Sequence, residues 1–182
     1  MSRALHSQYL RLLGLTALLA LALGAESAAQ RGRGPGPGQG PMMMHDQAHQ
    51  ADMRLFHELL DNRHLITRKV TKLNDGIDTL TESDDPAVAR KLQVHVAAMS
   101  ARVTEARPIH QRDPLFREIF RNTDKIVMRH ELTPKGVRVI ETSADPYVAL
   151  LIQAHAEVVN GFIANGHAEM MKNHSVPERP VP

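Results

Sequence analysis

The sequence of 182 residues contains no cysteine and no tryptophan, and only 3% of its residues are aromatic. The lack of cysteine excludes a disulfide framework, thiolate ligation of zinc or iron–sulfur clusters, a cysteine nucleophile and covalent c-type haem attachment. So few aromatic residues cannot build the stacking platforms that hold single-stranded nucleic acid. Basic and acidic residues nearly balance, at 22 against 20, so no phosphate-binding surface is expected and nucleic acid is not a predicted partner.

Motifs for several kinds of catalysis are also missing. The sequence has no Gly-rich phosphate loop before a helix, no paired-histidine zinc peptidase motif and no serine hydrolase elbow. An enzyme is therefore the least supported class. Hydrophobic residues make up 42% of the chain, enough to bury a core, and 11 His and 9 Met supply nitrogen and soft sulfur donors.

Residues 1–29 have the pattern of a secretory signal peptide. Arg3 and Arg11 accompany an apolar run, Leu12–Leu23, that is shorter than the roughly 20 residues needed to cross a bilayer. Small residues follow it, and cleavage is expected after Ala29. The pattern predicts a periplasmic or secreted protein with no integral membrane anchor after processing.

The remainder divides by composition into a tether, one domain and a tail. Gly and Pro dominate residues 30–44, which predicts a flexible tether because both residues disfavour helix and strand. Residues 45–175 have the size of a single domain. The Pro-rich residues 176–182 are predicted to form a flexible tail.

The sequence of the domain resembles itself when it is shifted by sixty residues. Aligning residues 55–99 with 115–159 without a gap gives 13 identities in 45 positions, several-fold more than chance. The identical pairs include Phe56/Phe116, Gly76/Gly136, Asp85/Asp145, Pro86/Pro146, Gln93/Gln153 and His95/His155. The comparison predicts an internal duplication, with repeats of about 53–107 and 113–173.

Each repeat is predicted to form helix–strand–strand–helix, which makes the fold class α+β with pseudo-two-fold symmetry. Strands are expected at 66–73, 77–81, 126–132 and 137–142, and Gly76 and Gly136 close the two hairpins as residues that accept positive φ. Asp followed by Pro begins the second helix of each repeat. The alternative is a mostly helical bundle, in which residues 66–73 continue the first helix.

His95 and His155 are the main candidate site residues. Both lie on the apolar face of the second helix of their repeat, and they occupy equivalent positions. They are either core histidines that hydrogen-bond to neighbours or a pair of ligands that meet at the pseudo-two-fold axis. Met99 follows His95 by one turn and could ligate the same ion, although its simpler role is to fill the core.

Two further groups of potential ligands lie near the ends of the domain. His45, His49 and Met53 are spaced at four-residue intervals near the tether, and His167, Met171 and His174 lie close together in the last helix. Thioether and imidazole groups together suit copper, especially Cu(I).

The leading hypothesis is therefore an exported protein that binds a transition metal or a metal cofactor. Copper is favoured, and haem b held non-covalently between His95 and His155 is second. The expected role is metal handling or electron transfer, with a redox or metal-transfer partner or a second copy of the chain as partners. The competing hypothesis is a cofactor-free duplicated domain that serves structure or protein interaction.

Overall fold

The structure is a computed structural model that describes residues 41–180, with side chains from residue 47 onward. All of the described residues belong to one compact unit. The predicted signal peptide, most of the predicted tether and the side chain of His45 lie outside the described residues. The elements in chain order are α1 (Pro41–Asp61), η1 (Arg63–Leu65), β1 (Thr67–Leu73), β2 (Gly76–Glu82), α2 (Pro86–Thr104), α3 (Pro114–Phe120), η2 (Thr123–Lys125), β3 (Val127–Thr133), β4 (Gly136–Thr142), α4 (Pro146–Asn165) and α5 (His167–Met170).

The fold is α+β, as the sequence predicted, and the helical-bundle alternative is wrong. The four strands form one antiparallel sheet in the order β1-β2-β4-β3, and each strand bound lies within one residue of its prediction. Along most of β1, exposed and half-buried residues alternate. This two-residue period is typical of a strand and does not fit a continuation of the first helix.

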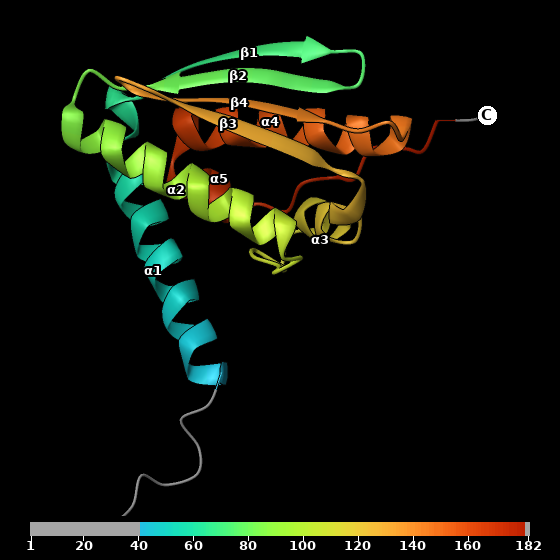
Figure 1. Ribbon diagram of the computed structural model, residues 1–182, viewed down its shortest axis with the longest axis horizontal. Coiled ribbons are helices and arrows are strands. Elements are labelled where there is room, and N and C mark those ends of the chain that lie inside the picture. Colours follow the sequence, from blue (N-terminus) through green and yellow to red (C-terminus); the bar gives the residue numbers. More distant parts are fainter. Residues whose placement is uncertain (1–40, 181–182) are drawn as a thin grey trace, which may run out of the picture. The chain divides into compact units, whose positions relative to one another are not determined.

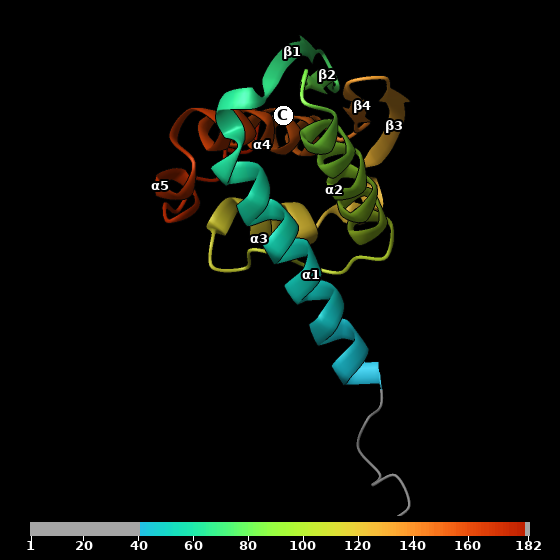
Figure 2. The same cartoon turned by 90° about the vertical axis from the view of Figure 1, so that its left-hand side faces the viewer.

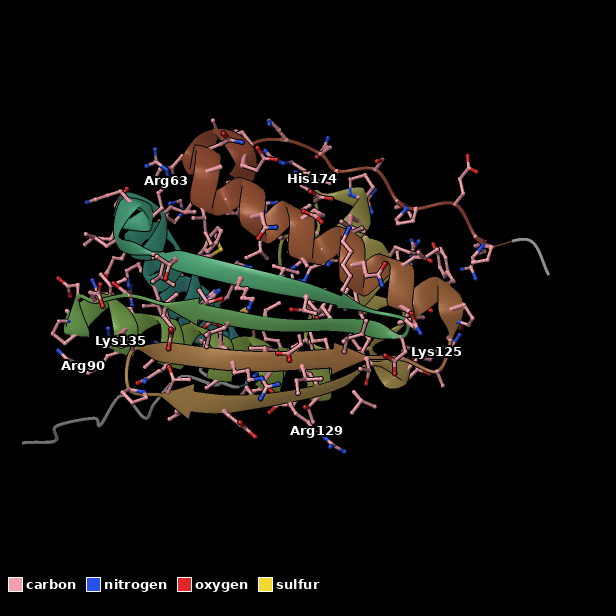
Figure 3. The ribbon with its side chains drawn as sticks, turned by 90° about the horizontal axis from the view of Figure 1, so that it is seen from above. Arg63, Arg90, Lys125, Arg129, Lys135 and His174 are labelled. Atoms are coloured by element: carbon pink, nitrogen blue, oxygen red, sulfur yellow. The ribbon has the colours of Figure 1, made fainter. Side chains whose placement is uncertain are left out.

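The long helices α2 and α4 lie on the same face of the sheet (Figure 1). Helix α2 packs mainly against β3 and β4, whereas α4 packs mainly against β2 and makes fewer contacts with β1 and β4. Each helix therefore covers strands that belong to the other half of the sequence. Seen from above in Figure 3, the outer face of the sheet has no described helix in front of it.

Gly76 and Gly136 do not have the positive φ predicted for them, since Gly166 is the glycine with positive φ among the described residues. They are instead required by close backbone contacts between the central strands. A Cβ on Gly76 would lie 1.9 Å from the carbonyl oxygen of Glu141, and one on Gly136 would lie 2.1 Å from that of Thr81. The second strand of each hairpin therefore begins with glycine, because the backbone of the neighbouring strand occupies the space that a side chain would need.

Equivalent residues of the two halves make equivalent contacts. Asp85 and Asp145 each accept hydrogen bonds from two backbone amides in the first turn of α2 and α4. Gln93 Nε2 donates to the carbonyl oxygens of Thr133 (2.9 Å) and Gly136 (3.2 Å). Gln153 Nε2 donates to those of Leu73 (2.8 Å) and Gly76 (3.3 Å).

Each of the two glutamines is half-buried against the hairpin of the other half. Strand pairing has the same symmetry, since Thr79 and Val139, which are sixty residues apart, face each other at the centre of the sheet. These paired contacts support the duplication, which stays a prediction.

The first helix begins and the last helix ends at other residues than the sequence predicted, and part of the tail is packed. Helix α1 already begins at Pro41, inside the segment predicted as tether. The last helix stops at Asn165, because Gly166 adopts a φ of 61°, and resumes as the short α5. Of the tail predicted to be flexible, Val176 packs against the core and the guanidinium of Arg179 lies 3.9 Å from the ring centroid of Tyr147.

The buried core is divided into three clusters rather than one. The largest joins α3 and α4 around Leu115, Leu151 and Phe162, and a second joins α4 to the sheet around Val148 and Ile152. Helix α4 is long and apolar enough by composition to span a membrane, yet eight of its residues are buried within this domain. The third and smallest cluster lies between α1 and α2.

Candidate functional site

A chamber of about 230 Å³ lies between the sheet and the helices. Figure 2, which looks along the sheet, shows α1, α2, α3 and α4 grouped below it. The chamber explains why α2 contributes so little to the buried core: its apolar residues Val96, Met99 and Val103 line the chamber and stay half-buried. All four phenylalanines of the chain also line it, namely Phe56, Phe116, Phe120 and Phe162.

His95 and His155 both line this chamber, so the structure brings the two equivalent imidazoles to the same interior space. The His95 ring is stacked on Phe56, with centroids 5.8 Å apart, and the His155 ring meets Phe116 edge-on at 5.2 Å. Within the described part of the chain, Nδ1 of His95 is buried and has no hydrogen-bond partner.

Both imidazoles are neutral near pH 7. Burial lowers the pKa of His95 to about 4, although the negative charge of Asp52 opposes this. Burial also lowers the pKa of His155 to about 4, and the positive charge of Arg68 lowers it further. Each neutral ring has one N–H donor and one nitrogen acceptor. The pair can therefore hydrogen-bond to a ligand or ligate a metal ion, but neither ring carries a charge.

Two methionines from the predicted ligand set, Met53 and Met99, also line the chamber. His49 lies elsewhere, exposed on α1. Among the described residues, no three or more His, Asp or Glu side chains are arranged so that they could hold one metal ion. Any metal in the chamber would therefore depend on imidazole and thioether groups together.

The predicted cluster of His167, Met171 and His174 does not form one site. His167 Nε2 lies 2.9 Å from Oδ1 of Asp61, and Met171 is 61% exposed. Both ring nitrogens of His174 (labelled in Figure 3) are already engaged, one with Asp113 at 2.6 Å and the other with Glu169 at 3.1 Å. Although partial burial lowers the pKa of His174, these hydrogen bonds raise it above its ordinary value. His174 therefore fastens the tail to the domain.

Several polar residues that line the chamber were not predicted as site residues, and three of them carry titratable or charged groups close to its sheet and α3 sides. Arg68 and Glu141 face the chamber from the sheet, and His110 lines it from the segment before α3. His110 has a φ of 55°, and its buried Nε2 has no hydrogen-bond partner within the described residues. The self-alignment could have pointed to Arg68 and Glu141, because a charged residue in one half is aligned there with an uncharged residue, Met128 or Thr81, in the other.

Comparisons of this chain with protein-family models, with curated proteins and with solved structures found no match.

Proposed function

We propose that this domain binds one small, largely apolar molecule in the chamber between its two halves. The observation that carries the proposal is the chamber itself, about 230 Å³ lined by the four phenylalanines and by the imidazoles of His95 and His155. An engineered apolar cavity of about 150 Å³ binds benzene. By scaling, this chamber suits a molecule of about nine or ten non-hydrogen atoms.

Packing and hydrogen bonding both support a binding role. Protein cores are ordinarily filled to the density of organic crystals, so an empty chamber of this size lowers stability, and a ligand that fills it restores packing contacts. The imidazoles of His95 and His155, both neutral, also offer hydrogen-bonding groups to a ligand in the chamber. The signal peptide predicted for residues 1–29 supports a role outside the cytoplasmic membrane.

A second candidate is Cu(I), the ligand favoured by the sequence. The supporting observation is that His95, His155 and Met99 line the same chamber, and that both imidazoles are in the neutral form that binds metals. Two imidazoles and a thioether suit Cu(I), and the role would be metal handling or electron transfer with an exported partner. Haem b is less favoured, because its macrocycle is much larger than the benzene used for the scaling above.

The binding proposal is tested by calorimetric titration of the full protein with indole, a neutral probe of suitable size. Val96→Phe fills the chamber from α2 and is expected to weaken binding at least about tenfold. Val94→Phe makes the same change on the same helix at a side that is 59% exposed, and is expected to leave binding unchanged. Val159→Phe on α4 repeats the test should Val96→Phe fail to fold. Equal binding of indole by the wild type and by folded chamber variants overturns the proposal, as does a wild type that binds neither indole nor any other probe of this size.

The copper candidate is tested by titrating Cu(I) in competition with a chromogenic chelator. Met99→Leu is expected to lower the affinity, whereas Met171→Leu, an exposed methionine, leaves it unchanged. Equal affinity of both variants rejects Met99 as a ligand. If neither indole nor Cu(I) binds to the wild type, the cofactor-free structural interpretation is favoured instead.

A further inference from the structure

The symmetry of the two halves is broken at the wall that the sheet contributes to the chamber. Arg68 on β1 and Glu141 on β4 line the chamber, and their equivalents sixty residues away are Met128 and Thr81. An exact repeat would present two identical walls. Here the wall carries one cation and one acid, so the ligand is expected to have two different ends.

Arg68 is fixed in place but keeps hydrogen-bonding capacity. Its Nε donates to Oδ1 of Asn160 at 3.2 Å, and its Nη1 donates to Oγ1 of Thr81 at 2.7 Å. Burial lowers the pKa of its guanidinium, and the negative charges of Glu141 and Glu157 oppose this. An arginine stays charged in proteins, and its other N–H groups are left to bind an anion in a planar, bidentate arrangement.

Glu141 is a weak counterion for Arg68. Burial raises the pKa of its carboxyl group to about 7, although the positive charge of Arg68 lowers it. No hydrogen bond joins this carboxyl group to the residues that the structure describes. The titratable groups that line the chamber with it are Arg63, Arg68, His95, His110 and His155. Once Glu141 takes up a proton, the charges that remain on the chamber wall are positive.

We infer that the ligand of the chamber is a small organic acid, with an apolar body of about one ring and a carboxylate that binds the guanidinium of Arg68. On binding, Glu141 takes a proton from solvent and donates it in a hydrogen bond to the ligand carboxylate. The apolar body lies against the phenylalanines. This inference rests on the proposed function, and it adds the charge and the orientation of the ligand.

The test compares three probes of similar shape, phenylacetate, phenylacetamide and phenethylamine, by calorimetric titration of the full protein at pH 6.5. We expect phenylacetate to bind at least about tenfold more tightly than the other two. Arg68→Met, which installs the residue found at the equivalent position 128, removes this preference and leaves phenylacetamide binding within about twofold. Arg129→Met, on an exposed residue of β3 that is labelled in Figure 3, is the matched control and keeps the preference.

Proton uptake is measured by repeating the phenylacetate titration at pH 8, where Glu141 is mostly ionised before binding, in two buffers of different ionisation enthalpy. We expect uptake of up to about one proton by the wild type, and a smaller uptake by Glu141→Gln. Equal affinity for phenylacetate and phenylacetamide, or tightest binding of phenethylamine, overturns the inference while the binding function stands. If indole and all three probes fail to bind, the proposed function itself is overturned.

Discussion

The buried carboxyl group of Glu141 makes a specific prediction about stability and pH. Its pKa rises from the ordinary value of 4.5 to about 7 because burial disfavours the charged form. Between these values the folded protein binds more protons at this site than the unfolded chain, so the site's contribution to stability falls as pH rises through this window. At about 1.4 kcal/mol per pH unit, the loss amounts to about 3 kcal/mol.

Comparison with Glu141→Gln isolates this effect, because glutamine cannot ionise. The free energy of unfolding of each protein is measured by urea titration at several pH values from 4.5 to 7.5. We expect the wild type to lose about 3 kcal/mol relative to Glu141→Gln across this range. The low pKa values of His95 and His155 affect both proteins alike and drop out of the difference.

The control variant is Glu131→Gln, which removes one carboxylate from an exposed position on β3. Its stability relative to the wild type is expected to stay within about 0.5 kcal/mol across the range. A similarly constant difference for Glu141→Gln would refute the reasoning, since it would mean that water reaching the chamber solvates the carboxylate as well as bulk water does.

Three further predictions concern contacts that hold the fold together. Gln153→Ala removes the side chain that donates to the carbonyl oxygens of Leu73 and Gly76, and should lower the free energy of unfolding by about 1–3 kcal/mol in urea titrations. Gly76→Ala places a Cβ 1.9 Å from a carbonyl oxygen of β4, and should cost about 1–3 kcal/mol or more, seen as a lower thermal midpoint. Asp52→Ala leaves the buried Arg102 unpaired, since the two lie 2.6 Å apart, and should cost about 3–5 kcal/mol; adding Arg102→Met should recover most of it in the same assay.

The sequence predicted the order and type of the elements because local signals agreed with tertiary structure. Asp85 and Asp145 cap their helices as expected, and the strands alternate in burial. The self-comparison also identified His95 and His155 as equivalent residues, and both line the chamber.

The rest depended on contacts that no local pattern records. Position 76 requires glycine because a strand more than sixty residues away in the sequence lies against it. Gln153 binds a hairpin that lies about eighty residues away in the sequence. Arg68 and Glu141 were not predicted, because self-comparison identifies residues that the two halves share, whereas these two charged residues lie where the halves differ.

The exchange of helices between the halves has a consequence for how this chain could be divided. Because α2 covers β3 and β4 while α4 covers β2 and β1, a fragment that ends near residue 107 would expose the strands that α4 protects. We expect that neither this fragment nor the remaining C-terminal one reaches a native state by itself. The two fragments mixed together, or two copies of either one, retain complementary surfaces. Under the predicted duplication, a single-repeat ancestor would have been an obligate dimer, and fusion of two gene copies would have converted a bimolecular assembly into a concentration-independent one.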